Sequence, residues 1–394
     1  MPFALLWLAL GTFAIGTESF LIAGLLPAIS ADLNIDIDSA GHLMSWFAGT
    51  YAVAAPVMAV LTGRFDRRNV LLLSLGMFTL ANLAAAFAPD YASLMGLRIA
   101  MALFSCLYTP AAAALAGSLV HADHRGRALA IVMAGLTVAT AIGVPFGTLV
   151  GEWFGWRASF LAVAAMGAFA FIGVGLGLPR LKPPVVLNLA QRLAPLQQSA
   201  VRYALLVTVL WVGGAYVLYT YLAAYAAERG IHGSGFAAAL MVFGVMAFAG
   251  NLYGGWSTDR LGARRTTRNA VLGLVPVFIG FSLVPANDAA MWSVIALLAV
   301  WPLVGFSAAP ARQALMIGLA PQSAPVLLAL NASALYFGFA FGAAIGGQVV
   351  AKLGADALGL VGAGIEVLAL AVMGLEHASQ RRTSQRKAAL AAAE

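Results

Sequence analysis

Two charged residues lie inside long apolar stretches of the chain, where a charge is costly. Glu18 falls within the run from Phe3 to Ile29, and Arg98 falls within the run 92–119. A carboxyl group at such a depth is usually functional, and because desolvation favours its neutral form it is a natural proton carrier. A buried guanidinium does not readily lose its proton and needs a partner, for which Glu18 is the candidate. We therefore predict a proton-coupling site at Glu18 and Arg98, with a purely structural role as the alternative.

Polar residues in other apolar runs form a set of candidates for binding a small molecule. Aromatic rings with polar tips suit an amphipathic or cationic aromatic ligand. An aromatic belt at the membrane interface is the alternative explanation for the tyrosines. The candidate substrate-binding residues are Tyr216, Tyr219, Asn251, Asn331 and Tyr336.

Other residues that could carry chemistry are few. Glu366 is a second carboxyl inside an apolar run, and His42 stands near the start of another; for both we favour a structural role. The only cysteine, Cys106, excludes a disulfide within the chain. No nucleophile–base set, metal-ligand cluster or phosphate loop stands out, so we expect no enzymatic activity, no metal and no cofactor other than a coupling proton.

The composition identifies the solvent that surrounds these residues. Of 394 residues, 62% are hydrophobic and only 9% are charged, whereas soluble domains carry about 25% charged residues. Such a chain does not cover its surface with polar groups, so lipid must surround much of it. The net charge of +7 does not indicate nucleic-acid binding, because the basic residues form short clusters between apolar runs. We expect a small-molecule substrate, a lipid bilayer, no nucleic acid, and a monomer.

The apolar runs are long enough to cross a membrane as helices, which takes about 20 residues. Twelve runs meet this condition, so the predicted fold is an all-α membrane protein of twelve transmembrane helices. They lie at 4–29, 41–62, 70–88, 92–119, 128–151, 158–178, 203–227, 236–257, 269–285, 290–316, 326–351 and 357–375.

The basic residues also orient the bundle. They cluster at 64–68, 125–127, 180–192, 260–268 and 381–387, whereas the loops on the other side are mainly acidic. By the positive-inside rule both termini are then cytoplasmic, as in a multi-pass protein of the inner (plasma) membrane. The longest connection splits the helices six and six. The predicted parts are a first bundle at 1–178, a cytoplasmic linker at 179–202, a second bundle at 203–376 and a basic cytoplasmic tail at 377–394.

The two halves show a weak internal repeat. The matched pairs are Thr62 with Thr258, Pro110 with Pro310, and Gly143 with Gly342, at offsets of 196, 200 and 199 residues. Similar offsets in three helix pairs indicate a duplicated six-helix unit. Duplicated halves generally place a binding site at their interface, near the middle of the membrane.

The repeated loops resemble the loop motif of the major facilitator superfamily, which reads roughly G-x-L-A-D-R-x-G-R-R. The second copy, GWSTDRLGAR at 255–264, fits well. The first copy, at 59–68, departs from the motif because Gly63 replaces the aspartate and Asp66 replaces a glycine. The resemblance covers essentially the whole chain and implies two pseudo-symmetric six-helix bundles. It also implies gating residues in these loops, namely Arg64, Asp66, Arg68, Asp259, Arg260 and Arg264, with the aspartate of the motif helping to latch the cytoplasmic side shut.

Further segments resemble the twelve-helix drug:proton antiporter branch of that family. FAIGTESF at 13–20 and GLLP at 24–27 are similar to the opening of chloramphenicol-type and sugar exporters. The antiporter motif of the fifth helix is similar to GVPFG, which implies gating by Gly143, Pro145 and Gly147; ordinary tight packing is the alternative. The resemblance implies export of a small amphipathic, chloramphenicol-like drug by proton antiport through alternating access. Export of a sugar or other metabolite, or a facilitator without antiport, is the alternative.

Overall fold

The computed structural model describes residues 3–121, 124–179, 189–285, 287, 290–320 and 323–391. Within these ranges all regular secondary structure is helical, and twelve helices are long and apolar enough to cross a membrane. The predicted class, an all-α membrane fold with twelve spans, is confirmed. Residues 180–188 of the predicted linker and 392–394 of the predicted tail lie outside the described residues.

The spans follow one another with short connections, and some consist of two consecutive helices. In the first half they are α1 (Ala4–Leu33), α2 (Ile37–Leu61), α3 (Arg67–Ala85), α4 (Tyr91–Ser118), α5 (Arg125–Val138) with η2 (Ala139–Gly143) and α6 (Val144–Phe154), and α7 (Trp156–Gly177). The connection contains α8 (Leu189–Leu193) and η3 (Ala194–Gln197). In the second half they are α9 (Ser199–Tyr219) with α10 (Leu222–Ala227), α11 (Gly233–Leu261), α12 (Ala263–Leu283), α13 (Met291–Gly305) with α14 (Ala308–Leu319), α15 (Ala324–Leu353) and α16 (Ala357–Ala391).

Three spans are interrupted where the sequence predicted continuous helices. The fifth contains a π-helical segment, η2, which ends at Gly143, two residues before Pro145. A proline has no N–H to donate to the preceding turn, and a π-helical turn accommodates the resulting change in hydrogen-bond register. The seventh span breaks after Tyr219 and the tenth after Gly305.

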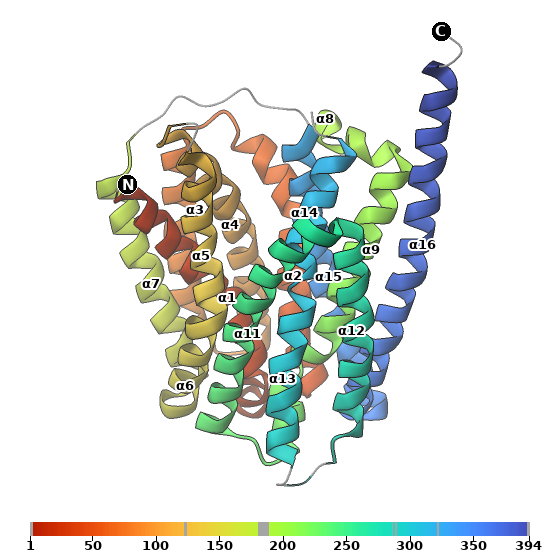
Figure 1. Ribbon diagram of the computed structural model, residues 1–394. Coiled ribbons are helices and arrows are strands. Elements are labelled where there is room, and N and C mark those ends of the chain that lie inside the picture. The colour runs from red at the N-terminus through yellow and green to blue at the C-terminus, as the bar shows by residue number, and fades with distance from the viewer. Residues whose placement is uncertain are drawn as a thin grey trace.

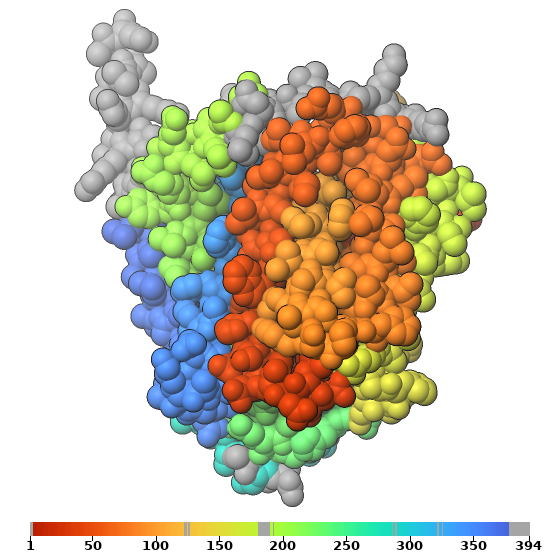
Figure 2. Space-filling model, turned by 180° about the vertical axis from the view of Figure 1, so that it is seen from behind, coloured from red at the N-terminus to blue at the C-terminus, as the bar shows by residue number. Residues whose placement is uncertain are grey.

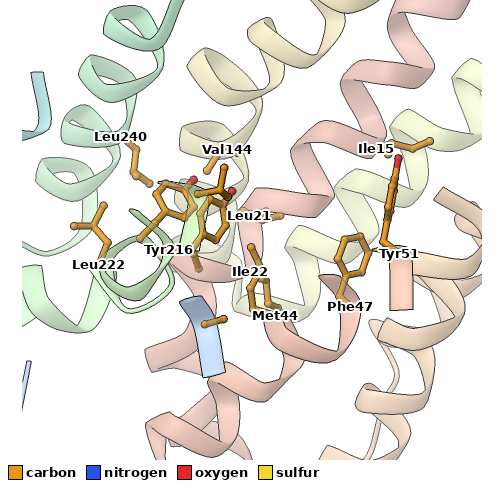
Figure 3. Close-up of a cluster of buried hydrophobic side chains, with 14 of the residues drawn as sticks. Ile15, Leu21, Ile22, Met44, Phe47, Tyr51, Val144, Tyr216, Leu222 and Leu240 are labelled. Atoms are coloured by element: carbon orange, nitrogen blue, oxygen red, sulfur yellow. The ribbon is translucent and has the colours of Figure 1, made fainter. Parts of the chain in front are cut away.

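The helices form two halves that lie side by side, with both chain ends at the upper end in Figure 1. The contact between the halves runs along α2 and α15, and α11 packs on η2 and α6. Figure 2 shows the first of these seams from behind, where blue α15 lies beside red-orange α2. Buried residues of both halves belong to one continuous apolar core, part of which Figure 3 shows.

Toward the end of the bundle opposite the termini, hereafter the far end, the halves approach so closely that only glycine fits at several positions. A Cβ atom on Gly41 would overlap the Tyr221 hydroxyl, and one on Gly244 would overlap the backbone of Ala141. Small residues allow such close approach of membrane helices. The two halves are therefore tightly closed against each other in this part of the bundle.

An arginine ties together three elements at the far end of the first half. Arg157, at the start of α7, pairs with Asp32 at the end of α1 and donates to the carbonyl of Ala88, beyond α3, at 3.1 Å. Its guanidinium also lies 4.2 Å from the ring centre of Trp156. The side chains of the pair are 37% and 46% exposed, so water screens much of their attraction.

The second half has the same arrangement with the charges exchanged. Arg229, just after α10, pairs with Asp356 before α16 and donates to the carbonyl of Val284, beyond α12, at 3.0 Å. These three residues follow their counterparts in the first half by 196 to 199 residues. The Arg229 side chain is completely buried and lies 3.6 Å from the ring centre of Tyr225. The repeat predicted from the loops therefore extends to this arginine contact.

Candidate functional site

Glu18 and Arg98 form an ion pair inside the first half. Glu18 lies halfway along α1, and its Oε1 accepts a hydrogen bond from Nη1 of Arg98 on α4. The two side chains are 1% and 0% exposed. The pairing predicted from the sequence is thus present. Because both charges have left water, their mutual attraction has to offset a large desolvation cost.

Arg98 also contacts α2, so that one guanidinium joins three helices. Its Nε donates to the carbonyl of Leu43 at 3.4 Å, and its Cζ lies 4.2 Å from the centre of the Phe47 ring. The pair is not fully satisfied, since Oε2 of Glu18 and Nη2 of Arg98 have no hydrogen-bond partner. Unpaired buried polar atoms are rare in protein interiors, so each of them calls for an explanation.

The predicted gating residues of the fifth span pack against the helix that carries Glu18. Gly143 lies so close to the Thr17 hydroxyl that a Cβ atom would overlap it, and a Cβ on Gly147 would lie 2.8 Å from the Leu21 side chain. Pro145, which lies between these two glycines in the sequence, is buried. These contacts fix the position of α1 on both sides of Glu18. They are what ordinary tight packing predicts, and a gating role for these residues is still a prediction.

Aromatic side chains from both halves gather around Phe20 on α1. Phe20, two residues after Glu18, makes edge contacts with Tyr219 and Phe339, with ring centres 6.4 and 6.0 Å apart. Tyr216 stacks on Phe339 at 4.0 Å. We call Phe20, Tyr51, Tyr216, Tyr219, Tyr336 and Phe339 the aromatic cluster.

The closest aromatic contact crosses from one half to the other. Tyr51 on α2 stacks on Tyr336 on α15, with ring centres 3.5 Å apart and planes at 10°. Tyr336 also makes an edge contact with Phe339 at 5.1 Å. Figure 3 shows Tyr51 beside Phe47, the residue on which Arg98 packs. The cluster therefore connects the ion pair to the interface between the halves.

The two candidate asparagines lie in different surroundings. Asn251 is exposed on α11, two turns from Gly244 and on the same helix face. Asn331 is buried and accepts a hydrogen bond from Thr208 at 2.9 Å. Thr208 in turn accepts from Arg312 at 3.3 Å, so Asn331 belongs to a polar network within the second half. We leave Asn331 out of the proposed substrate site.

That network contains a second buried ion pair. Arg312 donates to Glu376 at 3.4 Å and to the carbonyl of Ala204, and its side chain is 1% exposed. Unlike the Glu18–Arg98 pair, the Arg312–Glu376 pair has no buried side-chain N or O atom that lacks a hydrogen-bond partner. Full satisfaction of this kind is typical of a structural contact, here between α14, α9 and α16.

In the first gating loop, Asp66 has a local structural role. Its carboxylate caps α3 by accepting from the backbone N–H of Arg68 at 2.8 Å. Arg68 reaches α7, where it donates to the carbonyl of Gly175. Arg64 is exposed. All of these contacts lie within the first half.

In the second gating loop, Asp259 is exposed and makes no ion pair or side-chain hydrogen bond with the described residues. Arg260 is also exposed and lies 4.8 Å from the ring centre of Trp256. Arg264 contacts Nδ1 of His377 at 2.6 Å. The aspartate predicted to act as a latch is therefore unengaged in this conformation.

The remaining candidates differ in burial. His42 is half-buried at the start of α2, whereas Glu366 on α16 is completely buried. Among the described residues no group of three His, Cys, Asp or Glu side chains is arranged to hold a metal ion.

Sequence reasoning missed Tyr51, Phe20 and Phe339, which complete the aromatic cluster. Each is an aromatic residue in an apolar run, and nothing in the hydropathy pattern separates them from lipid-facing aromatics such as Phe248 and Trp292. Their membership of the cluster emerges only from contacts between helices far apart in the chain.

Comparison with known families identifies the class of this membrane protein as a transporter. The model of the family described as Major Facilitator Superfamily matches residues 8–326. The chain belongs to the major facilitator superfamily.

Curated relatives agree with this assignment. The chain is 33% identical over 383 residues to the inner membrane transport protein YdhP of Escherichia coli (strain K12), covering 97% of each. It is 32% identical over 357 residues to the uncharacterized MFS-type transporter YbcL of Bacillus subtilis (strain 168), covering 90% of this chain and 91% of the relative. It is 36% identical over 265 residues to a chloramphenicol resistance protein of Streptomyces lividans, covering 66% of this chain and 68% of the relative.

Solved structures share the fold. A D-xylose-proton symporter superposes with a TM-score of 0.75 at 15% identity, covering 94% of this chain and 96% of its own. A bacterial homologue of the human lysosomal transporter Spinster gives a TM-score of 0.73 at 18% identity, covering 96% and 97%. At these identities the likeness concerns the fold alone.

Proposed function

We propose that this transporter exports a small amphipathic solute of the chloramphenicol-like class by proton antiport. The observation that carries the proposal is the buried, incompletely satisfied Glu18–Arg98 pair beside an aromatic cluster drawn from both halves. Phe20 places the proton-binding residue two positions from the cluster. A proton at Glu18 and a ligand in the cluster would therefore act on the same segment of α1.

The ion pair supplies a physical link between protonation and conformation. While Glu18 is ionised, it balances the charge of Arg98. A proton on Glu18 removes this balance and leaves a buried cation, which is strongly unfavourable in a dry interior. Protonation thus favours a conformation in which Arg98 meets water or another partner, and a proton gradient shifts the population of the carrier accordingly.

The aromatic cluster supports an amphipathic aromatic substrate. Its rings provide flat apolar surfaces, and Tyr51, Tyr216, Tyr219 and Tyr336 add hydroxyl groups. Such a site favours stacking over the dense hydrogen bonding that a sugar requires. The relative named as a chloramphenicol resistance protein supports the same class. A sugar or another metabolite is the competing substrate.

We also propose that both termini face the cytoplasm, as the arginine distribution predicts. Reporter fusions at Ser199 and at the C-terminus should both give a cytoplasmic signal. A periplasmic signal at either position would contradict this orientation.

Transport by purified protein in proteoliposomes with an imposed pH gradient tests the function directly. Chloramphenicol, a cationic aromatic dye and a disaccharide form the substrate panel. We expect gradient-driven movement of an aromatic compound, with protons moving in the opposite direction. Movement of the disaccharide alone would establish the sugar exporter. Substrate movement that is insensitive to the gradient and releases no protons would establish a facilitator.

A further inference from the structure

Glu366 is a buried carboxyl group without a partner. It lies midway along the membrane span Ala357–His377 and is 0% exposed. Neither of its carboxyl oxygens has a hydrogen-bond partner. A charge in such a place would be very costly.

The internal repeat relates the place of this carboxyl to that of Glu18. Gly214 on α9 follows Glu18 by 196 residues, the same offset that relates Thr62 to Thr258. A Cβ atom on Gly214 would lie 2.8 Å from Oε1 of Glu366. The carboxyl from α16 thus occupies the space beside Gly214 that a side chain on α9 would take. Among the described residues, α1 thus supplies a carboxyl at this place in the first half, and α16 supplies one at the corresponding place in the second.

The second half contains no counterpart of Arg98. The residues that follow Arg98 by 196 to 200 positions are VIALL at 294–298, all apolar. The titratable side chains described on the helices that pack around Glu366 are Arg202, Tyr203, Tyr216 and Tyr219 on α9, Arg264, Arg265 and Arg268 on α12, Tyr336 and Lys352 on α15, and Glu376 and His377 on α16. None of them forms an ion pair or hydrogen bond with Glu366. No side chain that the structure describes on these helices therefore supplies a counter-charge for this carboxylate.

We propose that Glu366 is a second proton-binding site of the transporter, an inference that rests on the proposed antiport. Glu366 touches α9, which also carries Tyr216 and Tyr219 of the aromatic cluster and breaks after Tyr219. A shift of α9 against α16 separates Gly214 from Glu366 and admits water to the carboxyl. The proton leaves to water on one side, and the carboxylate takes up a proton from the other side before the contact closes again.

Infrared difference spectroscopy of the full chain in lipid tests the site without a substrate. The wild type should show a protonated-carboxyl band that is absent in Glu366→Gln and whose intensity falls as the pH rises. Glu366→Asp should restore a band that titrates, which distinguishes proton binding from a packing role. This variant also provides the test if Glu366→Gln does not fold. A Glu366 band of constant intensity over the whole pH range in which the protein stays folded would overturn the proposal.

Counting protons per exported molecule tests its role in transport. With opposing substrate and pH gradients, the gradient ratio at which net flux reverses gives the proton count. Glu366→Gln should lower this count by one relative to wild type and to Asp36→Asn, a control at an exposed carboxylate at the far end. An unchanged count would overturn the proposal. If the wild type itself shows no coupling, the proposed function fails, and the infrared titration still decides whether Glu366 exchanges its proton.

Discussion

The carboxylate of Glu18 and the guanidinium of Arg98 are in contact, yet each retains one buried polar atom without a partner. The other buried pair, Arg312 with Glu376, uses its polar atoms fully. This difference separates a pair that can change partners from one that holds helices together. It leads to expectations for variants of Glu18 and of Arg98.

Glu18→Gln keeps the shape of the side chain and removes its titration. Transport driven by a pH gradient should fall to background, because a side-chain amide does not take up and release protons as a carboxyl group does. Substrate binding and exchange without a gradient should persist. Flux in proteoliposomes and equilibrium binding measure the two effects, with Asp36→Asn as the matched control. Normal gradient-driven flux in the Glu18 variant would show that the proton binds elsewhere.

Arg98→Ala removes the counter-charge of Glu18. The buried carboxylate then favours its protonated form, so the transport optimum should move to higher pH by roughly one unit or more. Arg98→Lys retains the cation and should shift the optimum less. The pH profile of transport by equal amounts of folded protein provides the measurement. Superimposable profiles for wild type and the alanine variant would mean that the two groups act independently.

Arg229→Met should destabilise the protein more than Arg157→Met. The completely buried Arg229 holds Asp356 and the Val284 carbonyl, and a hydrogen bond to a charged group contributes about 1.5–3 kcal/mol. Arg157 is more than a third exposed, and exposed ion pairs contribute only about 0–1 kcal/mol. Thermal unfolding in detergent should rank the variants in this order. The reverse order would indicate that the exposed contact at the end of α1 limits stability.

Asp259→Asn should shift the population toward the inward-facing state, whereas Asp66→Asn should do little. Asp66 already caps α3, and asparagine caps a helix about as well. Asp259 is exposed here, and the family resemblance implies that it latches the cytoplasmic side in the alternate state; such a charge-assisted contact is worth about 1.5–3 kcal/mol. Since about 1.4 kcal/mol changes a two-state ratio tenfold, the shift should be at least several-fold.

Distances between spectroscopic labels across the cytoplasmic mouth report this population in each aspartate variant. A larger shift for Asp66→Asn than for Asp259→Asn would show that the altered first loop forms a latch in another register.

The sequence by itself determined that lipid surrounds much of the chain, how many spans there are, and that the six-helix unit is duplicated. Apolar runs of membrane length need no tertiary information to be recognised, because a single continuous segment in lipid satisfies its backbone hydrogen bonds internally only as a helix. The cost of charge in lipid likewise singled out Glu18 and Arg98, and the offsets of loops and prolines showed the repeat. The breaks after Tyr219 and Gly305 and the π-helical turn were missed, because hydropathy does not record the hydrogen-bond register of a helix.

Only the tertiary structure decided which side chains meet. Tyr51 faces Tyr336, Asn331 faces Thr208, and Glu366 lies against Gly214. These contacts depend on how each helix is rotated about its axis and shifted along it. When a helix is itself apolar on every face, its sequence pattern does not specify that rotation. Close packing of small residues between neighbouring helices fixes it, and so places each polar side chain.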